Sequence, residues 1–255
     1  MIRVQTLGTA LIEAGPVRLT PGSARKFALL LYLAVDRRRV SRATLHSLIF
    51  PDRTAQKAGH SLRDLIYQFR VAGLPIETDP DGVELTAGSA HADFDDFAAS
   101  AALTSEQLDA ATRGFLPGYA PDHSEAFSEW LEALRARTTH DLCGALAREI
   151  SRRRSAGDWM TMQRAARACL ALDPLHEEGT LAIAETLAMS GAKSKAVDML
   201  DQYSSEIGES RADLRLPANL LRRRISERVR DTYRTPLSLP FVGRGAEMTL
   251  LNERF

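Results

Sequence analysis

The 255 residues, 44% of them hydrophobic, are enough for two domains that each bury a core, and their formal charges sum to zero. Residues 1–90 hold 12 Lys and Arg against 8 Asp and Glu, while the rest hold 21 against 25, so the front half suits phosphates and the rear half suits proteins. Two cysteines give neither a disulfide framework nor a metal set, and the N-terminus lacks the apolar core of a signal peptide. No apolar run approaches the roughly 20 residues that cross a bilayer. We therefore expect a soluble cytoplasmic protein without membrane contact.

Short extended segments open the chain and predict a small antiparallel sheet. They cover residues 2–7, 10–13 and 17–19 and are separated by Gly8 and by Gly15-Pro16. From Ser23 the pattern changes to a helical period that ends at three consecutive arginines, with a single apolar stripe formed by Phe27, Leu30, Leu31 and Ala34. A second helix of about two turns begins after Ser41, a typical N-cap residue, and ends before Pro51; it carries Leu45, Leu48 and Ile49.

The third predicted helix, over residues 54–72, has two faces of different chemistry. Its apolar face follows the spacing of a buried stripe and consists of Ala58, Leu62, Leu65, Ile66 and Phe69. The opposite side is polar and consists of Arg53, Gln56, Lys57, His60, Arg63, Asp64 and Tyr67. In residues 75–85 an Asp81-Gly82 turn between two short strands then predicts a β-hairpin. Sheet, helices and hairpin together predict a winged helix-turn-helix domain over residues 1–90.

Residues 91–234 are predicted to form a second, all-α domain, because from Asp93 onward only amphipathic helices rich in Ala and Leu follow. Residues 157–174 match the second half of a tetratricopeptide-type repeat. Its 34-residue period superimposes Gly157 on Gly191, Met162 on Ala196 and Ala166 on Leu200. Residues 235–255, with two prolines at their start, read as a linker and a short tail. The predicted fold class is therefore mainly α: a winged helix-turn-helix with small antiparallel sheets, followed by tetratricopeptide-like helical repeats.

This order of parts resembles the antibiotic-regulatory-protein (SARP) type of bacterial transcriptional activator. Residues 45–52 look like the Leu-Trp-Pro-Asp stretch that ends a helix in that family, with Phe50 in place of Trp. Residues 61–70, Asp93-Phe94 and residues 157–178 carry the rest of the resemblance, which extends to the linker. It implies a response-regulator-like winged helix, a bacterial transcriptional activator domain of tetratricopeptide-like helices, and contact with RNA polymerase.

The tail resembles the beginning of another domain. Residues 239–247 look like the entry motif of the signal-transducing ATPase domain of larger family members, although Gly245 stands where Glu is more usual. No G-x-x-x-x-G-K-[ST] phosphate loop occurs in the 255 residues. We therefore expect a truncated regulator, or a fragment of a longer one, that does not bind nucleotide by that route.

The candidate DNA-contacting residues lie mainly on the third helix, because an α-helix fits the major groove and reads base edges with its outward side chains. Lys57, His60 and Arg63 are the foremost base contacts, flanked by Arg53, Gln56 and Tyr67. Phosphate contacts are expected from Arg42, near the N-terminus of the second helix, and from Arg38 and Arg39. The alternative is an ordinary solvated face; Asp64 and Gln68 depart from the family's more positive pattern.

The predicted wing is a further departure from the family. Where members often end the hairpin in Gly-Tyr-Arg-Leu, this chain has Gly82-Val83-Glu84-Leu85, with Glu77, Asp79 and Asp81 nearby. Four acidic residues would repel a minor groove. We expect the wing to add little affinity for DNA or to face a protein.

Other chemistry-bearing residues are predicted to be structural. Aromatic residues at helical spacing are more often core than a peptide-binding surface, and we expect the same of Cys143 and Cys169; the aromatic set is Phe115, Tyr119, Phe127, Trp130 and Trp159. His140-Asp141 and Ser124 cannot form a relay, since neighbouring helical residues point about 100° apart. The six histidines show no metal-ligand spacing. We expect no catalytic residue, no metal and no cofactor, hence no enzyme.

Two functions remain open. The first is a transcriptional activator that inserts its third helix into double-stranded promoter DNA as a homodimer on repeated half-sites and contacts RNA polymerase through its helical domain. The alternative is a protein-interaction module that has lost DNA binding and serves as the regulatory arm of a larger signal-transducing ATPase, as the acidic wing and the tail motif suggest.

Overall fold

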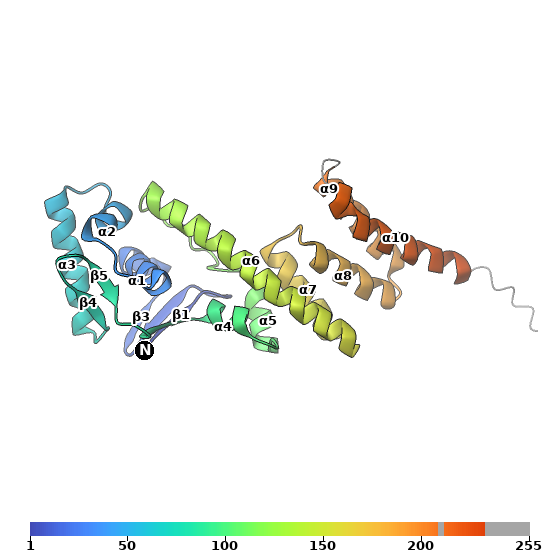
Figure 1. The fold of residues 1–255 in the computed structure, drawn as a ribbon, viewed down its shortest axis with the longest axis horizontal. Helices are drawn as coiled ribbons and strands as arrows, with labels where there is room; N and C mark the ends of the chain where they lie inside the picture. Colours follow the sequence, from blue (N-terminus) through green and yellow to red (C-terminus); the bar gives the residue numbers. More distant parts are fainter. Residues whose placement is uncertain (209–211, 233–255) are drawn as a thin grey trace, which may run out of the picture.

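The computed structural model describes residues 1–208 and 212–232, so the predicted linker and tail at 235–255 lie outside the described residues. Figure 1 shows an elongated molecule with the sheet and the first three helices at one end and a succession of helices at the other. The predicted fold class is confirmed: a small N-terminal sheet and a winged helix precede an all-helical region. Within the described residues no helix combines the length and the apolar character needed to cross a membrane.

The N-terminal sheet has one more strand than predicted. Strands β1 (Ile2–Gln5), β2 (Leu11–Ala14) and β3 (Val17–Leu19) pair antiparallel, as expected. A fourth strand, β6 (Ala90–Ala92), pairs parallel with β1 from Ile2↔Ala90 to Val4↔Ala92, giving the order β3-β2-β1-β6. The expected division between residues 90 and 91 falls inside this strand, so the chain completes the sheet as it leaves the winged helix.

Helix α1 (Ala24–Asp36) is buried on all sides from Phe27 to Ala34, whereas its sequence predicted a single apolar stripe. The sheet covers one side of α1, and aromatic residues from the helical region cover another. Tyr32 packs against Trp130 with ring centroids 4.7 Å apart, and Phe27 packs against Tyr119 at 4.9 Å. A helix with neighbours on several sides needs apolar residues all round.

The helix-turn-helix agrees with its sequence prediction. Helix α2 (Arg42–Ile49) begins at Ser41, whose side chain accepts a hydrogen bond from the Thr44 N–H at 3.0 Å. Helix α3 (Ala55–Val71) buries four of the five expected residues, Ala58, Leu62, Ile66 and Phe69, and half-buries Leu65.

The wing is the predicted hairpin of β4 (Ile76–Thr78) and β5 (Val83–Leu85). Val40 and Val83 exchange two backbone hydrogen bonds of 2.9 Å, which attach β5 to the segment before α2. Position 82 needs glycine because there is no room for a side chain: a Cβ would lie 2.4 Å from the Val40 carbonyl oxygen. The φ angle of Gly82 is not positive, so backbone conformation is not the reason.

The remaining elements are helices: α4 (Asp93–Ala99), α5 (Ser105–Thr112), α6 (Glu125–Ala156), α7 (Trp159–Leu172), α8 (Glu177–Met189), α9 (Lys193–Ile207) and α10 (Ala212–Thr232). The turns between α6 and α7 and between α8 and α9 both contain a left-handed glycine, Gly157 with φ 70° and Gly191 with φ 87°. The positions expected to be equivalent, Met162 with Ala196 and Ala166 with Leu200, are all fully buried. The structure thus repeats the helical hairpin at the predicted period.

Helix α6, 32 residues long, runs from the winged helix to the helical region beside α7 (Figure 1). Its first half contributes Phe127, Leu131 and Leu134 to the apolar cluster of the winged helix, and its second half packs in a separate cluster with α7. The hydroxyl of Ser124, just before α6, donates to the carbonyl of Leu48 on α2 at 2.9 Å. The apolar cluster of the winged helix therefore also includes residues from the first half of α6.

A second junction between the two regions is made by Asp93, the first residue of α4. Its carboxylate accepts hydrogen bonds from the backbone N–H groups of Thr6 and Leu7 at 2.9 and 3.0 Å and from the Thr6 hydroxyl at 2.6 Å. Thr6 is fully buried. These bonds satisfy donors at the end of β1 that would otherwise be unpaired.

Candidate nucleic-acid interface

Helix α3 presents an open face formed by the residues that the sequence singled out. Arg53, Gln56, Lys57, His60, Arg63 and Tyr67 are all exposed. Tyr67 is 69% exposed, which is unusual for an aromatic side chain at the surface of a small domain. The structure therefore brings the six predicted residues together on one accessible surface, which we call the α3 face.

The polar contacts of the α3 face stay within the helix and its first turn. The Arg63 Nε donates to the Gly59 carbonyl at 3.2 Å, and His60 Nε2 lies 3.3 Å from a carboxylate oxygen of Asp64. Arg53 donates to the hydroxyl of Ser61. Because these contacts are local and exposed, a ligand can replace them at little cost.

Phe50 positions the cation at the start of α3. Phe50 is 3% exposed, and the guanidinium carbons of Arg25 and Arg53 lie 5.3 and 5.4 Å from its ring centroid. The Arg25 Nε also donates to the Ile49 carbonyl at 3.2 Å. Phe50 thus holds Arg53 beside the N-terminus of α3.

The arginines expected to contact phosphates lie in ion pairs or near the wing. Arg38 pairs with Asp36 at 2.6 Å, and Arg39 pairs with both Asp79 and Glu84 of the wing. Arg42 donates to the Asp79 carbonyl at 3.3 Å. Their contact with phosphate stays a prediction, in which phosphate oxygens replace these exposed carboxylates and the carbonyl.

The acidic residues of the wing are largely engaged within the protein. Hydrogen bonds from the N–H groups of Gly82 and Asp81, together with the Arg39 guanidinium, lower the pKa of Asp79 although its partial burial opposes the shift. Glu77 accepts a 2.8 Å hydrogen bond from the Thr86 hydroxyl. Arg39 pairs with two of the four wing carboxylates but offsets only one unit of charge, so the wing keeps a net negative charge that would repel DNA.

Two residues that the sequence did not single out fix the geometry of this surface. Arg70, on the last turn of α3, donates to the Ile76 carbonyl at 3.2 Å and to the Thr78 hydroxyl at 2.8 Å, and so holds the wing against α3. His46 is on α2, and its ring lies against α3, 3.6 Å from where a Cβ on Gly59 would stand. Burial, assisted by the positive charge of Arg42, lowers the pKa of His46. Only tertiary contact distinguishes either residue from its neighbours.

The helical region has a groove of its own, which is a candidate partner surface. A cavity of about 270 Å³ lies between the end of α6, α8 and α10, and its lining includes Arg154, Trp159, Glu185, Met189, Leu221 and Arg224. Trp159 is 36% exposed, whereas the other aromatic residues that we expected in the core are buried or half-buried. The groove therefore combines apolar side chains with charges of both signs.

No protein-family model and no curated protein sequence matches the chain. A solved structure of Mycobacterium tuberculosis EmbR in complex with a low-affinity phosphopeptide is similar in fold, with a TM-score of 0.59 and 14% sequence identity. The similarity covers 91% of this chain and 70% of the EmbR chain. At this identity the likeness concerns the fold: a winged helix followed by helical repeats.

Proposed function

We propose that this chain is a sequence-specific DNA-binding transcriptional regulator of the SARP type. The fold that it shares with EmbR suggests a regulator of that type, in agreement with the sequence resemblance. The observation that carries the proposal is the α3 face: five exposed polar or aromatic side chains on a helix whose other face is buried in the core, with Arg53 just before the helix. Such a helix has the width and the donors that major-groove readout needs.

In the proposed complex, α3 lies in the major groove of promoter DNA. Lys57, His60 and Arg63 read base edges, and the Arg63 guanidinium grips a guanine with two hydrogen bonds. Arg53 and Arg42 bind the flanking phosphates, Arg42 with the help of the free N–H groups at the start of α2. Arg38 and Arg39 add phosphate contacts only where DNA displaces their carboxylate partners.

Activation, in this proposal, uses the rigid connection between the two regions. Because α6 contributes to the core of the winged helix and to the core of the helical region, binding of α3 to DNA fixes the orientation of the helical repeats. A homodimer on repeated half-sites would then present two helical regions at a set spacing. The groove beside Trp159 is the surface that we propose for RNA polymerase.

The experiment is fluorescence-anisotropy binding of the full chain to DNA from its own upstream region and to a scrambled control, at two salt concentrations. Arg63→Ala is compared with Arg167→Ala, which removes one exposed charge from α7, away from the α3 face. We expect binding that weakens with salt, a loss of selectivity of about 1–3 kcal/mol in Arg63→Ala, and no such loss in Arg167→Ala. Equal binding to both DNAs at both salt concentrations would contradict the proposal.

The acidic wing favours a second candidate function, a protein-interaction arm of a larger signal-transducing ATPase. Arg39, which could otherwise meet DNA, is committed to two wing carboxylates. This alternative gains support if the chain binds no DNA but captures an ATPase domain of the resembling family in a pull-down. Tight, selective promoter binding by the full chain would argue against it.

A further inference from the structure

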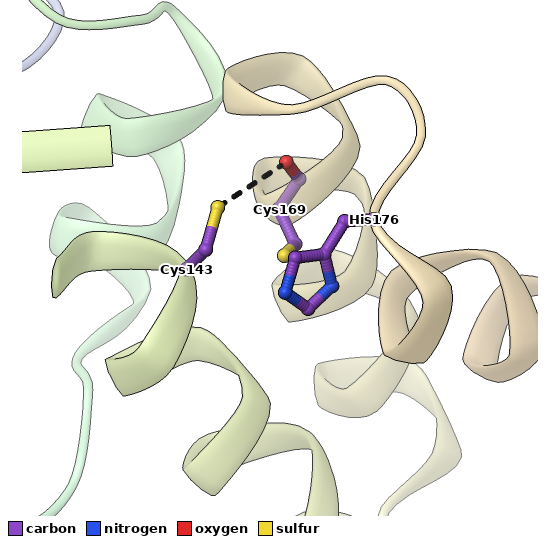
Figure 2. Close-up of side chains that lie close together, drawn as sticks. All are labelled: Cys143, Cys169 and His176. Atoms are coloured by element: carbon purple, nitrogen blue, oxygen red, sulfur yellow. Dashed lines mark hydrogen bonds between the residues drawn. The ribbon is translucent and has the colours of Figure 1, made fainter. Parts of the chain in front are cut away.

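The two cysteines of the chain, 26 residues apart in sequence, meet inside the helical region. Cys143 lies on α6, Cys169 lies on α7, and His176 is the N-cap residue of α8. Figure 2 shows the three side chains converging from these segments. One ligand atom from each residue, two sulfurs and a ring nitrogen, lie within 4.8 Å of one another. The spacing of these three residues follows no local motif, so sequence reasoning did not predict the cluster.

The sulfur atoms are buried and only weakly bonded. Cys143 and Cys169 are free thiols with exposures of 4% and 0%. Cys143 Sγ donates to the carbonyl of Cys169 at 4.0 Å, and that oxygen already accepts a 2.9 Å hydrogen bond from the Asp173 N–H. His176 is half-buried and gives the cluster an edge that solvent can reach.

We propose that Cys143, Cys169 and His176 form a binding site for a divalent cation of the zinc class. Thiolate and imidazole are ligands that such ions prefer. Two thiolates and one neutral imidazole cancel the charge of a divalent ion, so the complex places no net charge in the apolar core, whereas a monovalent ion would leave one negative charge. Three protein ligands leave one tetrahedral position for water.

Binding exchanges protons for the ion. Each S–H bond is broken, each sulfur donates an electron pair to the cation, and two protons pass to solvent. Because both thiols must lose their protons before the sulfurs bind the ion, affinity for the ion rises with pH.

His176 can turn one ring nitrogen to the ion at small cost. Its Nδ1 accepts a hydrogen bond of 3.4 Å from the Gly179 N–H, a long and therefore weak cap for α8. Nε2 takes no part in that bond, and we assign it as the ligand atom. A neutral imidazole bound through Nε2 carries its proton on Nδ1, so the cap is given up and His176 links α8 to α6 and α7 through the ion.

The test is titration of the reduced full chain with Co²⁺, which reports thiolate ligands by a sulfur-to-cobalt charge-transfer band, followed by displacement with Zn²⁺. We expect one ion per chain, release of about two protons per ion, and a higher unfolding temperature in the presence of Zn²⁺. Cys143→Ser and Cys169→Ser should weaken the band and the affinity, and His176→Gln should lower affinity by about tenfold or more.

His140→Gln is the matched control, because His140 is an exposed histidine on α6 outside the cluster. Circular dichroism establishes that each variant is folded before it is titrated. The His176→Gln variant, at the half-buried edge of the cluster, keeps the test decisive if a buried cysteine variant unfolds. Absence of the charge-transfer band at millimolar Co²⁺, a band that persists in folded Cys143→Ser, or equal affinity in His176→Gln and His140→Gln would overturn the proposal.

Discussion

Replacing Gly82 by Ala tests how the wing is attached. The new Cβ would lie 2.4 Å from the Val40 carbonyl oxygen and 2.9 Å from its carbonyl carbon, both backbone atoms that no side-chain rotation can move. To relieve this clash, the backbone at position 82 must move about 1 Å away from Val40, since ordinary carbon contacts are about 3.5–4 Å. That shift breaks the two hydrogen bonds between Val40 and Val83, which contribute about 0.5–1.5 kcal/mol each.

We expect Gly82→Ala to lower the free energy of unfolding by about 1–2 kcal/mol: the loss of the two hydrogen bonds less the gain of about 0.4–1 kcal/mol from restricting the unfolded chain. Gly144→Ala is the matched control: it lies within α6, its nearest neighbour would be an Arg148 nitrogen at 3.8 Å, and it should stabilise by about 0.5–1 kcal/mol. Urea denaturation measures both, and hydrogen exchange locates the change at the Val40 and Val83 amides. Unchanged stability together with unchanged exchange at Val83 would refute the reasoning.

Three further predictions concern the junctions and the buried histidines. Asp93→Ala should lower the free energy of unfolding by about 3–5 kcal/mol in urea denaturation, because it leaves the buried N–H groups of Thr6 and Leu7 without an acceptor. The control Asp96→Ala, which removes an exposed carboxylate from the same helix, should change it by less than about 1 kcal/mol. Phe127→Ala should cost about 3–5 kcal/mol and weaken DNA binding as well, since Phe127 is fully buried where α6 meets the winged helix; normal stability in that variant would exclude a shared core. Burial lowers the pKa of His46 and of His123 below the ordinary 6.5, so below that pH the unfolded chain binds more protons than the folded chain. The free energy of unfolding should therefore fall as pH drops below about 6.5. His46→Gln should reduce that fall, measured as urea midpoints across pH.

Local signals carried much of the prediction of the winged helix. Ser41 marks the start of α2 by its own side chain, and the apolar period of α3 leaves the polar residues on one exposed face. Both depend on residues close in sequence. Strand β6 was missed because the sequence of its three residues, Ala90 to Ala92, is not typical of a strand. They form one only by pairing with β1, which lies far away in the chain.

The features that could not be predicted from the sequence depend on interactions between distant segments. The apolar residues of α6 face the winged helix in its first half and α7 in its second, so no single stripe runs along the helix. The ion pairs of Arg39 and the cluster of Cys143, Cys169 and His176 likewise depend on the path of the chain between their members. The composition of these segments does not specify which partners they meet.

The shared core sets where the protein can be divided. A chain cut after residue 90 would keep Phe27 and Tyr32 of α1 but lose Tyr119 and Trp130, which cover them. Apolar surface of that kind, left open to water, favours aggregation. A hybrid protein made by exchanging the winged helix should therefore be joined within α6, after Leu134, where the apolar cluster of the winged helix is complete.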